Sequence, residues 1–357
     1  MSILDVLPAD AWLRWALVIA AALAVVSAAL MVQVLLLSEL STRRERRRAA
    51  FERRWRPRLA AASIGEPLDQ LPPPSPRDCA WFLMAWCQMQ FHLRGAAHQR
   101  LNGLLEHFGL ADRAAALLTH RRGSMQLLGL ACLRHLADPA YWDRIEPLVR
   151  DARPILSLAA ADALVAIDPR RAMALVVPVA AERRDWAPGR VAILCRNAGR
   201  DATTPPLVEM LRQPLRPGAR ARLLELLRFG EAQALARWAR DMLRADAATG
   251  ERMAALDVLA QAQDPRDRPH LLPMLGASAP GVRLAAVRAL AAQATRDDLA
   301  CLQPGLADRD WSVRQATAHG IATLPGMTPA ALAHLRERID DPYGRDALDQ
   351  AIAEQSP

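Results

Sequence analysis

The sequence predicts an all-α fold, namely an α-solenoid of about eight or nine helical hairpins preceded by one transmembrane helix. Four arginines recur at every 31st position, and each is followed two positions later by alanine and seven positions later by leucine or isoleucine. They are Arg252, Arg283, Arg314 and Arg345. A period of this length is typical of stacked helix pairs. Aromatic residues make up only 4% of the chain, so strands have little to build them.

The N-terminal part contains an apolar run over residues 15–37 that only Ser27 and Gln33 interrupt. As a helix, this run can cross the roughly 30 Å hydrocarbon layer of a membrane. Trp12 and Trp15 stand at its start, where an indole ring suits the headgroup zone. We interpret the run as an uncleaved anchor. A cleaved signal peptide, which would have a basic start and a shorter apolar run, and a buried hydrophobic helix are the alternatives.

Basic residues follow the apolar run at once and predict its orientation. Residues 41–58 hold nine arginines against two glutamates, which gives +7, whereas residues 1–40 sum to −2 and the rest of the chain to +3. Because basic flanks stay in the cytoplasm, we expect the N-terminus outside and the later residues inside, at a bacterial inner membrane. The same cluster could also bind anionic lipid. The membrane-proximal basic residues are Arg43, Arg44, Arg46, Arg47, Arg48, Arg53 and Arg54.

Proline and glycine divide the remaining chain. Pro57 is expected to end any helix that leaves the membrane, and the five prolines of residues 65–76 predict an extended spacer. Residues 81–94 and 96–108 predict an aromatic-rich helix pair that caps the array. The expected segments are an external N-terminus (1–14), a transmembrane helix (15–37), a basic juxtamembrane segment (38–62), a Pro-rich linker (63–76), the capping pair (77–110) and the solenoid (111–357).

The period of the arginines fixes where the hairpins should fall. Counting along it, we expect second helices to begin near Ser124, Ile155, Pro188, Gly218, Gly250, Gly281, Ser312 and Gly344. Three Asp-Pro pairs, at Asp138, Asp168 and Asp264, follow second helices, where proline suits the start of the next helix.

At this point the chain resembles the HEAT-repeat family, in particular its short bacterial type, which is also seen in phycobilisome-lyase-like proteins. The best match is residues 306–318 (LADRDWSVRQATA), with weaker copies at 281–287 and 250–256. The resemblance covers roughly residues 111–354. It implies the fold, and it is compatible with scaffolds, adaptors and a few enzymes.

The residues that could perform chemistry do not form a site. No lysine occurs, which excludes a Gly-Lys-Ser/Thr phosphate loop and a Schiff base. The eight histidines and five cysteines show no zinc-ligand spacing, and Cys79, Cys87, His92 and His98 come nearest to a cluster. We therefore expect no catalytic residues, metal, cofactor or small-molecule ligand. The small charge of the body disfavours nucleic acid. A lyase-like enzyme using the groove, or a nucleic-acid-binding solenoid, remains the alternative.

Candidate partner-binding residues are the four periodic arginines together with Trp186 and Trp311. A guanidinium can receive acidic side chains of a partner, but in the resembling family such arginines pair with acidic residues of neighbouring turns, for which Asp310 and Asp341 are suitable. Trp186 and Trp311 lie just before second helices, where they could be exposed contacts or could pack on the next repeat. The sequence thus predicts a membrane-anchored scaffold that docks a protein partner at the cytoplasmic face. Because of this location, we expect the partner to be membrane-associated as well.

Overall fold

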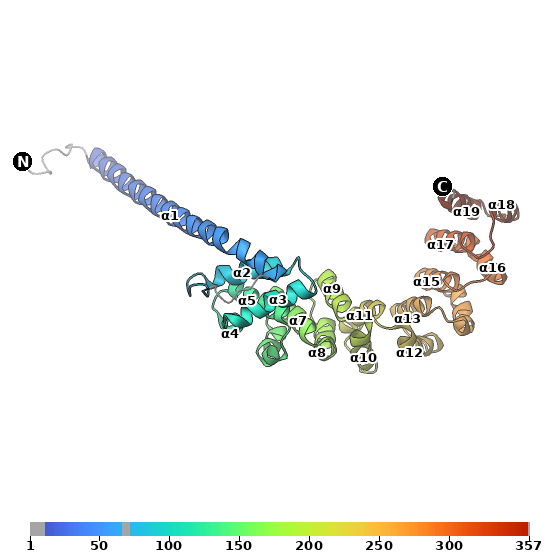
Figure 1. Ribbon diagram of the computed structural model, residues 1–357. Coiled ribbons are helices and arrows are strands. Elements are labelled where there is room, and N and C mark those ends of the chain that lie inside the picture. The colour runs from blue at the N-terminus through green and yellow to red at the C-terminus, as the bar shows by residue number, and fades with distance from the viewer. Residues whose placement is uncertain (1–10, 66–71, 356–357) are drawn as a thin grey trace, which may run out of the picture. The chain divides into compact units, whose positions relative to one another are not determined.

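The computed structural model describes residues 11–65 and 72–355, and every regular element within them is a helix (Figure 1). This confirms the predicted all-α fold. Most of the expected external N-terminus (1–14) and part of the Pro-rich linker (63–76) lie outside the described residues. Contacts group the chain into two units, Met1–Ala114 and Ala115–Pro357.

The first unit begins with one long helix, α1 (Ala11–Ile64), which corrects the expectation that Pro57 ends the helix. Phe51, Trp55 and Leu59, spaced four residues apart, are buried on one side of α1 and belong to its contacts with α2 and α3. Burial of these large side chains outweighs the backbone hydrogen bond that proline cannot donate. The second half of the segment expected to hug the membrane is therefore part of the folded unit.

Two short helices, α2 (Cys79–Gln90) and α3 (Ala96–His107), complete this unit. The ring of Trp55 meets that of Phe82 edge-on, with 4.9 Å between the ring centroids. The indole N–H of Trp86, which is fully buried, donates to the carbonyl oxygen of Leu101 at 2.8 Å. Gly95 separates α2 from α3 with φ 62°, a left-handed backbone that glycine adopts without strain.

The second unit is a succession of helical hairpins. Each hairpin has a first helix, in several cases partly a 3-10 helix, and then a second helix. Its elements from the first complete helix onward are α5 (Gly123–Leu136), α6 (Trp142–Ile145) with η4 (Glu146–Arg150), α7 (Pro154–Ile167), α8 (Pro169–Glu182), α9 (Pro188–Ala198), α10 (Arg200–Leu211), α11 (Pro217–Leu226), α12 (Ala232–Arg244), α13 (Thr249–Ala262), α14 (Arg268–Leu271) with η7 (Leu272–Gly276), α15 (Pro280–Ala291), α16 (Leu299–Leu302) with η9 (Gln303–Ala307), α17 (Trp311–Ala322), α18 (Pro329–Glu337) and α19 (Pro342–Gln355). The short η2 (Leu117–Thr119) packs on α5.

The second helices stack on one another as the period predicts. All of the odd-numbered helices from α5 to α19 begin within two residues of their predicted starts. In the last four hairpins the second helices start at positions 249, 280, 311 and 342, so the step between them is constant and equals that of the periodic arginines. Contacts run from α13 to α15, from α15 to α17 and from α17 to α19 (Figure 1). Helix α15 contributes side chains to both apolar clusters of this unit, which links them into one spine.

Aspartate and proline mark the helix starts as expected. The carboxylate of Asp168 accepts hydrogen bonds from the backbone N–H groups of Arg170 and Arg171, and Pro169 is the first residue of α8. Asp138 and Asp264 cap the following turns in the same way. Such caps satisfy backbone donors that a helix start leaves free.

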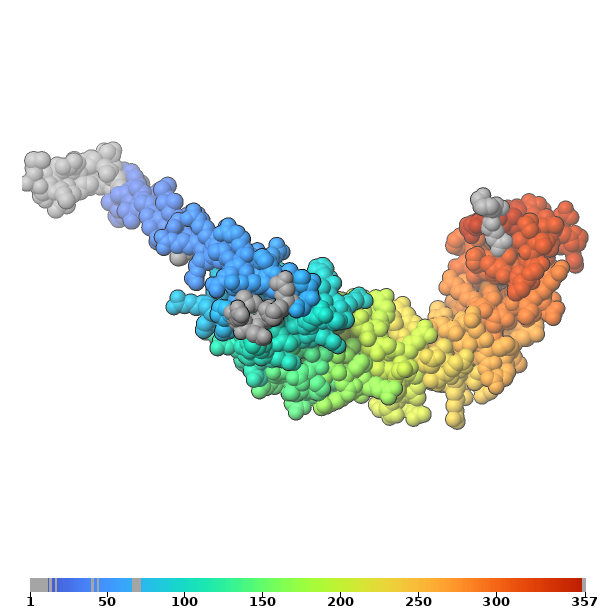
Figure 2. Space-filling view, viewed as in Figure 1, coloured from blue at the N-terminus to red at the C-terminus, as the bar shows by residue number. Residues whose placement is uncertain are grey.

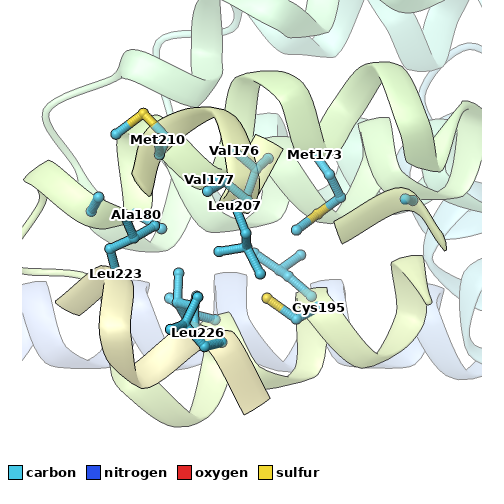
Figure 3. Close-up of a cluster of buried hydrophobic side chains, with 14 of the residues drawn as sticks. Met173, Val176, Val177, Ala180, Cys195, Leu207, Met210, Leu223 and Leu226 are labelled. Atoms are coloured by element: carbon cyan, nitrogen blue, oxygen red, sulfur yellow. The ribbon is translucent and has the colours of Figure 1, made fainter. Parts of the chain in front are cut away.

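The regular spacing is interrupted between α7 and α11. Second helices begin at positions 154, 188 and 217 there, so the first step is longer than the period and the second is shorter. Helix α11 packs against α8 of the preceding hairpin. Figure 3 shows the resulting core, in which Val177 and Ala180 of α8 lie with Cys195 of α9, Leu207 of α10 and Leu223 of α11. Burial raises the pKa of the Cys195 thiol to about 11, so this cysteine behaves as a small hydrophobe.

Candidate functional site

Three of the four periodic arginines bind the backbone at the end of the first helix in their own hairpin. An Nη atom of Arg252 donates to the carbonyl of Ala245 at 3.4 Å, that of Arg283 to Ala277 at 2.9 Å, and that of Arg314 to Asp308 at 2.7 Å. Each acceptor is the residue that ends a first helix. A cation there satisfies free carbonyls and opposes the helix dipole. In three of the four hairpins the periodic arginine therefore caps the end of the first helix.

Two of these arginines, Arg283 and Arg314, also reach the next hairpin. Arg283 binds both carboxylate oxygens of Asp308, which follows η9, at 2.7 Å each. This pair holds the pKa of Asp308 below its usual range, mainly through the hydrogen bonds from the guanidinium. The guanidinium of Arg314 lies over the ring of Tyr343 in the next hairpin, 5.3 Å from its centroid. These contacts tie successive hairpins together, which supports a structural role for Arg283 and Arg314.

The expected acidic partners of these arginines are wrong. Asp310 caps α17 by accepting a hydrogen bond from the backbone N–H of Ser312, and Asp341 accepts one from Gly344. The pKa of Arg283 is raised chiefly by its hydrogen bonds with Asp308 and in smaller part by the charge of Asp310, so Asp310 acts on Arg283 only at a distance, without an ion pair. Arg345 is exposed, and within the described residues it makes no side-chain ion pair.

The two candidate tryptophans differ in exposure. Trp186 is buried, and its indole N–H donates to the Ser157 hydroxyl at 3.2 Å, so it packs inside the array and is not an exposed contact. Trp142 of α6 is buried as well. Trp311, the first residue of α17, is 64% exposed. Their similar positions in the sequence did not predict which of the two is exposed. The turn before α9 is longer than the turn before α17, and it folds Trp186 inward.

Sequence reasoning missed a second set of ion pairs between successive first helices. Arg240 of α12 binds Asp267, which is fully buried, and Arg268 of α14 binds Asp298 at 2.6 Å. Asp267 and Asp298 are separated by one full period of the repeat, and this spacing is the signal that could have found them. A buried carboxylate requires such a partner to offset its desolvation.

The exposed side of the second helices contains a hollow of about 580 Å³, which we name the Trp311 groove. Helices α15, α17 and α19 line it. Several of its lining residues are small, namely alanine and glycine. The large side chains that line it are Arg288, Trp311, Gln315, His319, Gln350 and Glu354. Small side chains let the backbone of a bound molecule come close to the helices.

One polar row runs through this surface. Asp257, Arg288, His319 and Gln350 occupy the same position of the repeat, one on each of α13, α15, α17 and α19, and all four are exposed. Asp257 also lines a neighbouring hollow of about 270 Å³ between α11 and α13. The period therefore repeats an exposed polar position as well as the buried apolar ones.

The first unit contains one helix segment, Val18–Glu39, that is long and apolar enough to cross a membrane, judged by length and composition. The apolar stretch of this segment is not buried by any other part of the chain that the structure describes, and its side chains are exposed (Figure 2). Arg43 pairs with Glu39 and Arg48 with Glu52, each at 2.9 Å along the helix. The exposed basic side chains after the segment are Arg43, Arg46, Arg47, Arg48, Arg53, Arg54 and Arg56, whereas the side chain of Arg44 lies outside the described part of the chain.

Comparison with known protein families decides the repeat type. Residues 269–354 match the family model of HEAT repeats. These residues form a HEAT-repeat array. The match confirms the resemblance, and it falls where the second helices follow the period without drift. The Trp311 groove lies within these HEAT repeats, since its lining residues run from Arg288 to Glu354.

Other comparisons say little about function. One solved structure similar to this chain is the crystal structure of an engineered protein, which is 16% identical, has a TM-score of 0.34, and covers 78% of this chain and 85% of its own. A likeness of this size carries no argument here. No curated protein sequence matches this chain significantly.

Proposed function

We propose that this protein is a membrane-anchored scaffold that docks a protein partner at the cytoplasmic face of the inner membrane, with binding rather than catalysis as its role. One observation supports this most directly. Helix α1 is continuous from the exposed apolar segment Val18–Glu39 into the folded first unit, where Phe51 and Trp55 are buried. A chain built in this way joins an anchor to the folded first unit without a flexible joint at Pro57.

The charge distribution supports the orientation. The arginines that follow the apolar segment are exposed on α1, as a cytoplasmic flank requires. Only the short segment before the apolar run would lie outside, and the HEAT repeats would lie inside. The membrane-facing end of the protein is then basic, which also favours anionic lipid nearby.

The continuous helix limits the distance between membrane and folded unit. Twelve residues separate Glu39 from Phe51, which at the α-helical rise is about 18 Å. The helix keeps the first unit close to the membrane surface. Confinement to such a layer raises the effective concentration of the array toward membrane-associated partners, without any tighter contact.

An affinity capture tests this function. The full chain and a variant that begins at Ser41 are compared for partners retained from detergent-solubilised membranes. The variant keeps Phe51, Trp55 and Leu59 and so preserves the first unit, which a deletion of residues 1–76 would destroy. We expect the full chain to retain a specific membrane protein and the variant, which lacks the anchor, to retain less of it. If neither retains a specific protein, the scaffold role is wrong.

A further inference from the structure

We propose that the Trp311 groove binds an extended peptide segment of the partner, with an acidic side chain at Arg288 and an apolar or aromatic side chain against Trp311. This inference deepens the proposed function and rests on it for the existence of a protein partner. It names the surface, the class of ligand and the side chains that recognise it.

Trp311 provides the apolar contact. Its indole is 64% exposed at the start of α17, whereas the indoles of Trp142 and Trp186 in the same unit are buried and donate hydrogen bonds. Asp310 caps α17 and so fixes the backbone that holds Trp311. A large aromatic side chain at the edge of a hollow is the residue type that contributes most to protein interfaces.

Arg288 provides the charge. It is exposed, it lines the groove from α15, and within the described residues it forms no ion pair or hydrogen bond. Its neighbour Arg283 differs, because both ends of that guanidinium are taken by Asp308 and by backbone carbonyls. Asp257 faces Arg288 from α13 without pairing with it. The fork of Arg288 is therefore available for a carboxylate of the ligand.

The groove floor suits a peptide backbone. Gln315 of α17 and Gln350 of α19 both line it, and a carboxamide presents one acceptor and two donors, which match the N–H and C=O of a peptide unit. The Gln350 amide donates to Glu354 at 3.0 Å, so its oxygen remains open to a ligand N–H.

The direction of the groove favours an extended ligand over a helix. It crosses three successive helices, α15, α17 and α19, and small side chains such as Ala292 and Ala316 leave room close to their surfaces. Arg288 stands on α15 and Glu354 on α19, so the two sides of the groove have opposite charge. We expect the acidic residue of the peptide to lie over α15 and the rest of the segment to extend toward α19.

A displayed library of random octapeptides provides the probe. It is selected on the immobilised full chain in detergent micelles, and enriched peptides are resynthesised for binding measurements. We expect enrichment of sequences with Asp or Glu within four residues of an aromatic residue or leucine. Trp311→Ala should weaken their binding tenfold or more. Arg288→Glu should abolish it and should enrich peptides that carry arginine or lysine instead.

Matched controls separate recognition from damage to the fold. Phe91→Ala removes another exposed aromatic ring, from the first unit, and Arg296→Glu reverses an exposed charge between α15 and α16. Neither should change binding of the enriched peptides, and all four variants should keep the thermal midpoint of the parent chain.

Three results would overturn the proposal. The first is a selection without enrichment, and the second is enriched peptides whose binding neither Trp311→Ala nor Arg288→Glu alters. The third is self-association in ultracentrifugation that Trp311→Ala abolishes, since the occupant would then be a second copy of the chain. If the chain binds the peptides but fractionates with soluble proteins, the proposed membrane scaffold is wrong and the proposed peptide binding in the Trp311 groove still stands. A membrane-bound chain without peptide binding would refute the groove alone.

Discussion

The guanidinium of Arg283 forms two hydrogen bonds of 2.7 Å with the carboxylate of Asp308, one residue standing in α15 and the other in the turn before α17. The same guanidinium caps η7 through the carbonyls of Ala277 and Ser278. One side chain thus closes its own hairpin and fastens it to the next. The helix cap is shared with Arg252 and Arg314, and Arg314 also reaches the next hairpin through the ring of Tyr343.

Removal of the Arg283 side chain should destabilise the C-terminal hairpins. Arg283→Gln leaves Asp308 without its partner and η7 without its cap, so we expect a loss of roughly 2 to 3 kcal/mol in the free energy of unfolding. Arg309→Gln, an exposed arginine in the following turn, is the control and should change it by less than about 0.5 kcal/mol. Urea denaturation followed by circular dichroism measures both. Equal effects would contradict the assigned role.

The Arg283 pair should also make stability depend on acid pH. The pKa of Asp308 is lowered in the folded state, chiefly by its hydrogen bonds with Arg283, so the pair stabilises the fold above the unfolded pKa of about 4. This contribution is lost as the pH falls below that value toward the lowered pKa. Asp308→Asn should therefore flatten the decline of the thermal midpoint below about pH 4. A decline identical to that of the parent chain would exclude the contribution.

The two turn tryptophans should respond differently to truncation. Trp186→Ala removes a buried indole and leaves a cavity, for which we expect a loss of roughly 3 to 5 kcal/mol. Trp311→Ala removes an exposed ring and should change stability by less than about 0.5 kcal/mol. Thermal unfolding of both variants measures the difference. A strongly destabilised Trp311→Ala chain would mean that this indole packs in the fold.

The end of α1 should be required for the order of α2 and α3. Trp55→Ala opens the aromatic contact with Phe82, and we expect a loss of roughly 3 kcal/mol within the first unit. Arg56→Ala, the exposed next residue, serves as its control. Amide hydrogen exchange of α2 and α3 reports the result. Unchanged protection in Trp55→Ala would mean that residues 51–62 are only a juxtamembrane segment and do not belong to the folded unit.

The repeat architecture could be predicted because the hairpins obey a local rule. Apolar positions such as Leu259 and Leu290 recur at fixed spacing and are buried in the same way, so counting placed every second helix within two residues. The prediction that Pro57 ends the helix was wrong because proline is only a local helix breaker. The burial of Phe51, Trp55 and Leu59 against other helices, which the local sequence does not show, keeps the helix intact.

The candidate surface was only partly predictable. Trp186 lies two residues before α9 and Trp311 is the first residue of α17, so both stand near the start of a second helix, and the folded turn before α9 buries Trp186. The row of Asp257, Arg288, His319 and Gln350 can be counted from the period, but its four side chains have no common chemistry that would mark it as a binding surface in the sequence. Exposure along a face is a property of packing, which a single sequence does not state.

Labelling of single cysteines in whole cells tests the central claim, an array of HEAT repeats tied to the cytoplasmic face by its leading helix. The five natural cysteines are replaced by alanine or serine, and either Ser2→Cys or Ser278→Cys, an exposed residue before α15, is added. With a membrane-impermeant maleimide, we expect Ser2→Cys to be labelled in intact cells and Ser278→Cys only after permeabilisation. Labelling of Ser278→Cys in intact cells, or recovery of the chain among soluble proteins, would contradict the account.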